Sequence, residues 1–224
     1  MLRIIRSEPS AVLLAVQLLA ILVYPFLEGN GAGRALFSLL GILVMALVIL
    51  AVRSSPALTG ISLVLGLPAA VLLIIQAVTD SATLNPYSSA LEAILYFYGA
   101  YALIRYMLAD HEITRDELYA VGATFTLVAW AFAYVFVFLQ IVQPGCFIAA
   151  VDSDQPRTWM ELLFLSFTNL SSTGLSDIVP VTAHARSVVM IEQLAGLGYV
   201  ALFVSRLVGL TISRQMAGSS TDER

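Results

Sequence analysis

Long apolar segments with few charges dominate this chain and constrain its fold more than any other feature. Charged residues make up 12% of the 224 residues and hydrophobic residues 59%, whereas a soluble domain carries about 25% charged residues. A helix needs roughly 20 mostly apolar residues to cross a hydrocarbon core of about 30 Å. Because lipid cannot satisfy backbone polar groups, each span has to satisfy its own in a helix. The sequence therefore predicts an all-α membrane protein.

Six segments have the length and composition of transmembrane helices. They are residues 11–27, 35–52, 57–78, 88–108, 118–142 and 184–213. Breakers separate them, such as the glycine-rich residues 28–33, the pair Asn85 and Pro86, and the charged linker 110–117. We therefore predict six transmembrane helices.

The arginines predict how these helices cross the membrane. All 11 basic residues are Arg, and basic residues accumulate on the cytoplasmic side of membrane proteins. If the N-terminus lies inside, only Arg34, Arg157 and Arg186 fall outside. We therefore expect a multi-pass protein of a prokaryotic cell membrane, with both termini in the cytoplasm and membrane lipids around it.

Composition also argues against several functions. The net charge of −4 argues against nucleic-acid binding. The single Cys146 excludes an intrachain disulfide and a multi-cysteine metal site. The sequence has no glycine-rich phosphate loop, and its two histidines, His111 and His184, fall on opposite sides of the predicted membrane. We expect neither an enzyme nor a bound cofactor.

The segment between the last two predicted spans has a different pattern. Residues 159–169 (WMELLFLSFTN) predict a short helix of about three turns, which is too short to cross the bilayer. A loop rich in hydroxyl groups follows and ends at Asp177 and Pro180. Irregular backbone at membrane depth is tolerated where it is buried in protein or lines water. The pattern therefore predicts a re-entrant helix and loop lining an aqueous pore, with several copies of the chain around one axis.

The direction of the short helix favours a cation in that pore. A helix that enters from outside has its carboxyl end, the negative end of its dipole, at the membrane centre. The acids Asp152, Asp154, Glu161 and Asp177 would add a negative outer mouth that concentrates cations. The alternatives are an ordinary solvated face for the three aspartates and a structural i, i+4 pair between Glu161 and Arg157.

Residues 159–209 resemble the pore domain of tetrameric potassium channels. The selectivity filter of that family has the pattern Thr-Val-Gly-Tyr-Gly-Asp, and this chain has Ser-Thr-Gly-Leu-Ser-Asp at residues 172–177. The matching residues are, in order, Ser172, Thr173, Gly174, Leu175, Ser176 and Asp177. The family's Asp-x-x-Pro spacing is kept up to Pro180, and Gly196 falls where many members have a hinge glycine in the inner helix.

This resemblance implies a homotetrameric cation channel and a division of the chain. Residues 1–117 would form a four-helix, sensor-like membrane domain, residues 118–214 the pore domain, and residues 215–224 a disordered cytoplasmic tail. The layout is that of the voltage-gated-like branch, whose sensor helix carries several regularly spaced arginines. The fourth predicted span has only Arg105, so we expect little voltage dependence.

The changed filter residues leave the permeant ion open. In such filters, backbone carbonyls replace the hydration shell of the ion, and glycines provide the positive φ angles that orient them. Gly174 is kept, but a left-handed Ser176 would cost about 1–2 kcal/mol, and Leu175 lacks the family's phenol hydroxyl. We predict K⁺ permeation through an inner filter around Ser172. The alternatives are a weakly selective Na⁺/K⁺ channel and a non-conducting subunit that keeps the pore fold.

Two acids lie inside predicted spans and are candidates for a functional role. Glu92 is expected to make a buried polar contact or to lie near the outer interface. Glu192 is expected to be a buried acceptor that supports the short helix, or else a charge in the pore cavity. Near it, Gly196 and Gly198 could permit bending during gating or allow close helix packing.

Overall fold

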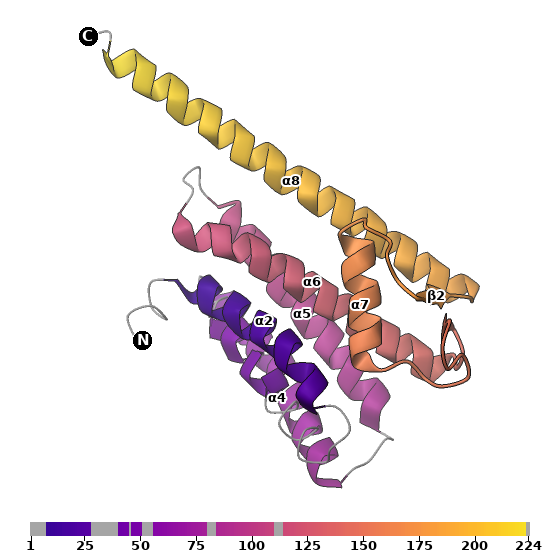
Figure 1. Cartoon of the computed structure of the whole chain (residues 1–224). Coiled ribbons are helices and arrows are strands. Elements are labelled where there is room, and N and C mark those ends of the chain that lie inside the picture. Colours follow the sequence, from indigo (N-terminus) through magenta and orange to yellow (C-terminus); the bar gives the residue numbers. More distant parts are fainter. Residues whose placement is uncertain are drawn as a thin grey trace.

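The protein is almost entirely helical in the computed structural model, which describes residues 8–27, 40–44, 46–50, 56–79, 84–109 and 114–222. Figure 1 shows a bundle of helices, a short helix that crosses it, and one long helix that extends beyond it. The elements are α2 (Pro9–Leu27), α4 (Pro56–Thr79), α5 (Asn85–Met107), α6 (Arg115–Val142), β1 (Phe147–Ala149), α7 (Trp159–Leu170), β2 (Ile178–Pro180) and α8 (Ala183–Asp222). Residues 40–44 and 46–50 are also helical.

Three of the described helices are long and apolar enough to cross a membrane. They are α2, α6 and the Ala183–Arg206 part of α8. Helix α5 is not among them, because its five tyrosines and its serines lower its hydropathy. The predicted second span falls partly outside the described residues. The helical fold class is therefore confirmed, and the six-span layout stays a prediction.

Helix α6 lies at the centre of the bundle and packs against α5, α2 and α7. The side chain of Thr114 caps its first turn by accepting from Glu117 N at 3.2 Å, and Asp116 and Glu117 place negative charge at its amino end. The helix ends before Pro144, which cannot continue it, and Gly145 turns the chain with a φ of 77°. Local sequence signals therefore explain both ends of this helix.

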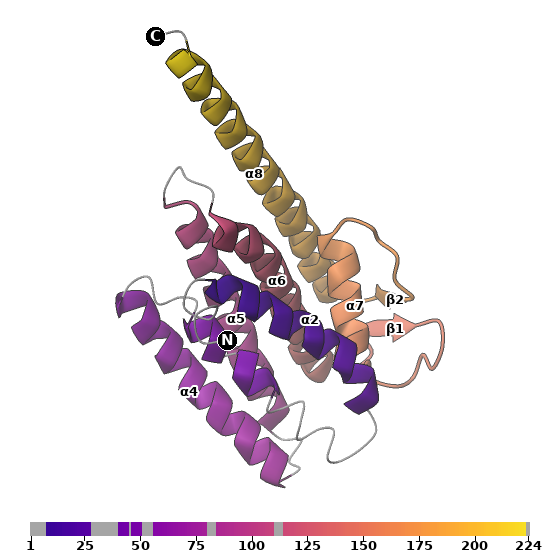
Figure 2. The ribbon, with the colours of Figure 1, turned by 60° about the vertical axis from the view of Figure 1, so that its left-hand side comes forward.

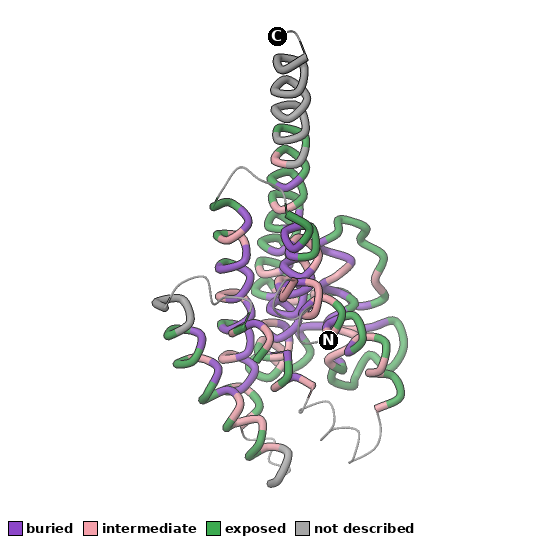
Figure 3. Tube along the Cα trace, turned by 90° about the vertical axis from the view of Figure 1, so that its left-hand side faces the viewer, coloured by how far each residue is buried: buried purple, intermediate pink, exposed green. Residues whose placement is uncertain are grey.

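The buried core joins the bundle to the start of α7. Leu13, Tyr96 and Trp130, from α2, α5 and α6, belong to one buried cluster, which appears in purple in Figure 3. The ring of Trp159, the first residue of α7, lies 5.3 Å from that of Trp130 and 5.4 Å from that of Tyr24. Aromatic pairs at this separation attract each other. The amino end of α7 is thus anchored on α2 and α6.

Two neighbouring acids at the start of α6 connect it to α2 and α8. Asp116 accepts hydrogen bonds from the backbone N–H of Ser10 at 3.0 Å and from its hydroxyl at 2.9 Å. It therefore occupies the amino end of α2, where free N–H groups and the helix dipole favour an anion. Glu117 forms an ion pair with Arg206 of α8 at 3.4 Å.

Helix α8 leaves the bundle, and most of those of its residues whose burial is described lie on the surface. It contacts the rest of the chain mainly through α7, with fewer contacts to α6, and Figure 3 shows exposed residues along much of its length. It continues to Asp222, so residues 215–222 are helical where we expected a disordered tail. The domain division at residues 117 and 214 stays a prediction.

Replacing Asp116 by Ala should lower the unfolding temperature of the purified protein. The substitution removes both acceptors of Ser10, and hydrogen bonds to charged groups contribute about 1.5–3 kcal/mol. The change can be measured by tryptophan fluorescence during heating in detergent. The control is Asp154→Ala, since Asp154 is exposed and its side chain accepts from its neighbour Ser153. Equal unfolding temperatures for the two variants would contradict the role of Asp116.

Candidate functional site

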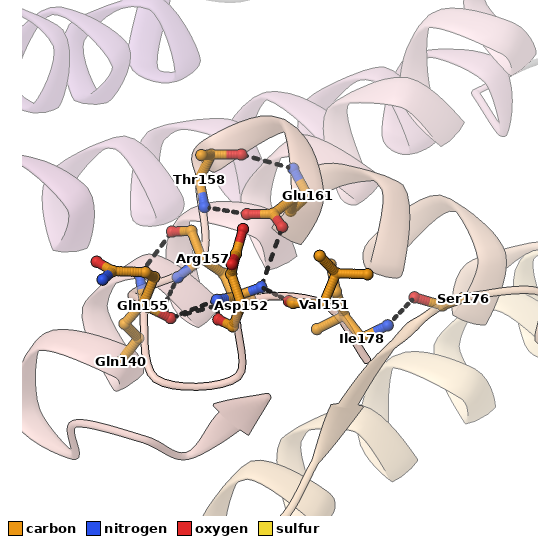
Figure 4. Close-up of polar contacts among 9 residues, drawn as sticks. All are labelled: Gln140, Val151, Asp152, Gln155, Arg157, Thr158, Glu161, Ser176 and Ile178. Atoms are coloured by element: carbon orange, nitrogen blue, oxygen red, sulfur yellow. Dashed lines mark hydrogen bonds and ion pairs between the residues drawn. The ribbon is translucent and has the colours of Figure 1, made fainter. Parts of the chain in front are cut away.

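The loop after α7 is the candidate site, and α7 itself begins at a well-defined cap. The Thr158 hydroxyl accepts from Glu161 N at 3.3 Å, and the Glu161 carboxylate accepts from Thr158 N at 2.6 Å. This reciprocal capping box satisfies two backbone donors that the helix leaves free. Glu161 also pairs with Arg157 at 3.2 Å, as the close-up in Figure 4 shows. The structural i, i+4 pair predicted from the sequence is confirmed.

Arg157 closes the loop that leads into α7. Its side chain is buried and donates to the backbone carbonyls of Val151, Asp152 and Gln155. Its own backbone is held by Gln140 of α6, which accepts from Arg157 N at 2.7 Å and donates to Arg157 O at 2.9 Å. One guanidinium thus organises three carbonyls around the entrance of α7 (Figure 4).

A two-stranded sheet beside α7 fixes the far end of the candidate loop, and the sequence did not predict it (Figure 2). Strands β1 and β2 pair antiparallel, with Phe147 opposite Pro180 and Ala149 opposite Ile178. Cys146 is buried at the edge of this sheet, and its carbonyl accepts from Val181 N at 2.9 Å. Burial raises the pKa of the Cys146 thiol, so the residue packs as an apolar side chain at neutral pH.

The backbone of the candidate loop is attached to the carboxyl end of α7. The carbonyl of Thr168 accepts from the backbone N–H groups of Thr173 at 2.9 Å and Gly174 at 3.0 Å. It also accepts from the Thr173 hydroxyl at 3.2 Å. These bonds satisfy a carbonyl that the end of the helix would leave free, and they turn two consecutive N–H groups toward α7.

The orientation of those N–H groups determines where the loop carbonyls point. All peptide bonds in this loop are trans, and in a planar trans peptide the C=O points opposite to the N–H. Since the N–H groups of Thr173 and Gly174 point at Thr168, the carbonyls of Ser172 and Thr173 point away from α7. The loop therefore presents two successive carbonyl oxygens on its free side.

The strained positions of the loop differ from the expected ones. Ser172 has a φ of 61° and Gly174 a φ of 64°, so left-handed residues alternate with Thr173. Ser176, which stands at the family's second glycine, does not adopt a positive φ, and the strain expected there lies at Ser172 instead. A non-glycine residue in this region costs of order 1–3 kcal/mol, and such strain clusters at functional sites.

The outer half of the loop has a different support from the inner half. The Gly174 carbonyl accepts from Ser176 N at 3.2 Å across a three-residue turn, and the Ser176 hydroxyl accepts from Ile178 N at 3.1 Å. Leu175, in the middle of this turn, is 76% exposed in the single chain. Asp177 is also exposed, which agrees with the solvated position expected for it.

A cavity of about 450 Å³ lies between the loop, the end of α7 and α8. It is lined by Thr168, Asn169, Ser172, Gly174, Gln193, Leu194 and Leu197. The structure therefore brings the predicted residues Ser172 and Gly174 together around one space. Thr168 and Asn169 also line it; we had not singled them out because their roles depend on contacts with distant residues. Among the described residues, no group of three or more His, Cys, Asp and Glu side chains could hold a metal ion.

Glu192 of α8 contacts two side chains of α7 near its carboxyl end. It is fully buried, its carboxylate accepts from Asn169 Nδ2 at 3.3 Å, and it also contacts the hydroxyl of Ser166. The Ser166 hydroxyl lies 2.8 Å from the carbonyl of Ala129 in α6 as well. The prediction of a buried acceptor that supports the short helix is confirmed, and Glu192 is not a charge in the cavity.

Glu92 of α5 is the second buried acid, and it lies away from the loop. Its side chain is 2% exposed and lies close enough to that of Tyr134 of α6 to interact with it. The predicted buried polar contact is therefore confirmed. Glu92 contributes to the packing of α5 on α6 and not to the candidate site.

Gly196 allows α8 to approach the backbone of α7. A Cβ atom at this position would overlap the carbonyl oxygen, carbonyl carbon and Cα of Leu170. A Cβ at Gly198 would meet nothing within 4 Å. The close-packing role proposed for Gly196 is confirmed, whereas a role as a gating hinge stays a prediction.

Comparison with known protein families supports a pore module in this part of the chain. Residues 122–212 match the family described as Ion channel, which includes the pore-loop potassium channels. The matched segment begins within α6 and ends within α8, so it contains α7, the candidate loop and the two-stranded sheet. The comparisons with curated proteins and with solved structures each found no significant match.

Replacing Gly196 by Ala should push α8 away from α7 and lower the unfolding temperature of the assembled protein. Overpacking of this kind costs about 1–3 kcal/mol. The matched control is Gly198→Ala, which has free space and should leave stability unchanged or raise it, because Ala favours a helix over Gly by about 1 kcal/mol. Thermal unfolding of both variants tests the assignment. A loss of stability that is as large in Gly198→Ala would contradict it.

Proposed function

Because residues 122–212 match the pore-loop potassium-channel superfamily, we propose that the protein is a homotetrameric cation channel permeable to K⁺. The observation that carries this proposal is the pair of carbonyls of Ser172 and Thr173, which point away from α7. Four copies of this loop around one axis would offer stacked rings of oxygens, the arrangement that replaces the hydration shell of K⁺.

The orientation of α7 also favours a cation. The loop lies at its carboxyl end, where the dipole of the 12-residue helix is negative. The loop is hydrogen-bonded to the carbonyl of Thr168 at this end of the helix. The loop carbonyls therefore lie close to the negative end of the helix dipole. An anion at the free side of the loop would meet carbonyl oxygens and a negative helix end, which disfavours anion conduction.

The surface of α8 supports assembly around an axis. Six of its exposed apolar side chains recur with alternating spacings of four and three residues, as in helices that pack on copies of themselves. The members of this stripe are Met190, Leu194, Leu197, Ala201, Val204 and Val208. An exposed apolar stripe beside an exposed polar loop marks an interaction surface that a single chain leaves uncovered. In a tetramer the stripe would lie against other copies below the filter.

Helix α5, the predicted fourth span, has too few basic residues for a voltage sensor. Arg105, in the last turn of α5, is the only basic residue of that helix. A sensor needs several charges at depth in the membrane to couple to the field. We therefore propose a channel with little voltage dependence, in a cell membrane, with both termini in the cytoplasm. We propose neither an enzymatic activity nor a cofactor beyond the permeant ions.

A weakly selective Na⁺/K⁺ channel is the second candidate, and the outer half of the loop favours it. The Gly174 carbonyl is engaged by Ser176 N–H, so it is not free in the way that the Ser172 and Thr173 carbonyls are. Fewer oxygen rings would leave fewer sites at which the two ions are distinguished. The two candidates differ in the permeability ratio and not in the architecture.

Purified protein in liposomes should conduct K⁺. The expected result is a K⁺ flux, followed by a reversal potential under K⁺/Na⁺ bi-ionic conditions that shows a preference for K⁺. A reversal potential near zero would favour the weakly selective channel. If the assembled protein passes neither ion at any voltage, the chain is a non-conducting subunit and the proposed function is wrong.

Replacing Asp177 by Asn should reduce K⁺ conductance most strongly at low ionic strength. Asp177 follows the loop and is exposed, so its charge would raise the local cation concentration at the outer mouth. The Debye length falls from about 30 Å at 0.01 M salt to about 3 Å at 1 M, so the effect should fade as salt rises. The control is Glu8→Gln, which also removes one negative charge but at the start of α2, outside the candidate loop. A reduction that does not depend on salt would contradict this role for Asp177.

A further inference from the structure

We propose that Glu192 is a positioning residue for the ion-binding loop, because it fixes the turn of α7 from which the loop carbonyls take their orientation. This inference rests on the proposed function and deepens it, since it places part of the control of selectivity in α8, outside the loop. Three steps connect α8 to the ion path: the contact of Glu192 with α7, the turn shared with Thr168, whose carbonyl holds the loop, and a second contact between α8 and α7 at Gly196.

The first step is the contact between Glu192 and α7. The carboxylate contacts the side chains of Ser166 and Asn169, which are three residues apart and so lie on one face of the helix. A carboxylate has two acceptor oxygens and can serve two donors at once. Glu192 is 0% exposed, so water does not compete for these positions within the chain.

The second step is the turn that these residues share with Thr168. Thr168 lies between Ser166 and Asn169, and its carbonyl accepts from the backbone N–H groups of Thr173 and Gly174 and from the hydroxyls of Ser171 and Thr173. Any rotation or shift of this turn therefore moves the acceptor that orients the loop. The peptide planes of Thr173 and Gly174 would follow, and with them the carbonyls of Ser172 and Thr173.

The third step is the second contact between the same two helices. Gly196 lies one turn after Glu192 and touches the backbone of Leu170, just beyond Asn169. Two neighbouring turns of α8 thus hold the last two turns of α7, one by hydrogen bonds and one by close approach. A displacement of α8 at this level would be transmitted to the loop without passing through the cavity.

The chemistry of the contact explains why an acid stands at this position. Asn169 donates with its amide, and the single hydroxyl proton of Ser166 lies between two acceptors, the Glu192 carboxyl group and the Ala129 carbonyl. Glutamine would offer one oxygen and would turn its own NH₂ group toward one of the two α7 side chains. Where that side chain is Asn169, two buried donors face each other, which is costly, so the turn should shift until both find acceptors.

The test exchanges the acid and the amide between the two helices. Glu192→Gln and Asn169→Asp each disturb the contact, and each should lower the K⁺/Na⁺ permeability ratio by up to about tenfold, as expected for the loss of one buried hydrogen bond. The double variant Glu192→Gln/Asn169→Asp restores an amide–carboxylate pair in the opposite direction and should recover most of the ratio. The control is Ser187→Ala, since Ser187 is exposed and its hydroxyl donates within α8 to the carbonyl of Ala183.

A second measurement follows the loop without relying on conduction. Hydrogen exchange of the Thr173 and Gly174 amides should be several-fold faster in Glu192→Gln than in the unmodified protein, and slow again in the double variant. If Glu192→Gln does not assemble, Ser166→Ala removes one donor and keeps the acid, and the same two measurements apply to it.

The outcomes separate this inference from the proposed function. A variant that assembles with an unchanged permeability ratio and unchanged amide exchange overturns the role of Glu192, while the proposed function stands. An unmodified protein that conducts no ions overturns the proposed function, and the exchange measurement then decides whether Glu192 orients the loop. Failure of the double variant to recover either property would show that Glu192 and Asn169 do not act through their mutual contact.

Discussion

The docking of α7 between α6 and α8 is the interaction on which the rest of the site depends. The carboxyl end of a helix has free carbonyls, and an irregular loop has free N–H groups. Here the Thr168 carbonyl and the N–H groups of Thr173 and Gly174 satisfy each other, which is possible only if the helix end stays in place. The contacts of Trp159 with Trp130 at one end and of Glu192 with Asn169 at the other keep it there.

Several polar side-chain contacts among the described residues join helices that have to keep a fixed position relative to one another. Asp116 holds the amino end of α2, Glu117 pairs with Arg206 of α8, and Glu192 holds α7. An apolar surface does not by itself fix the register of two helices in lipid, because lipid tails are as apolar as the side chains. A buried hydrogen bond, by contrast, requires a narrow range of donor–acceptor distances and angles. These contacts therefore set the register that the apolar surfaces leave open.

Much of the architecture could be predicted from local patterns, and the rest could not because it depends on distant contacts. The apolar runs predicted the long helices, the length of residues 159–169 predicted a helix too short to span, and the spacing of Arg157 and Glu161 predicted their ion pair. The approach of Gly196 to Leu170 depends on how α8 crosses α7, and no local pattern encodes that crossing. The positive φ of Ser172 could not be predicted either, because the bonds of the loop to Thr168 impose it on a residue with no intrinsic preference for it.

The two halves of the loop have separate supports, and this separation explains how altered filter residues can coexist with an ordered inner half. The inner half is held by Thr168 of α7, whereas the outer half is held by its own turn at Leu175 and by Ser176, which accepts from Ile178 at the start of β2. A change at Leu175 or Ser176 therefore acts on the turn and the two-stranded sheet, and it reaches the Ser172 and Thr173 carbonyls only through Gly174. Glycine has the widest backbone freedom, so it can absorb a different outer geometry at φ 64° while the bonds to Thr168 hold the inner carbonyls.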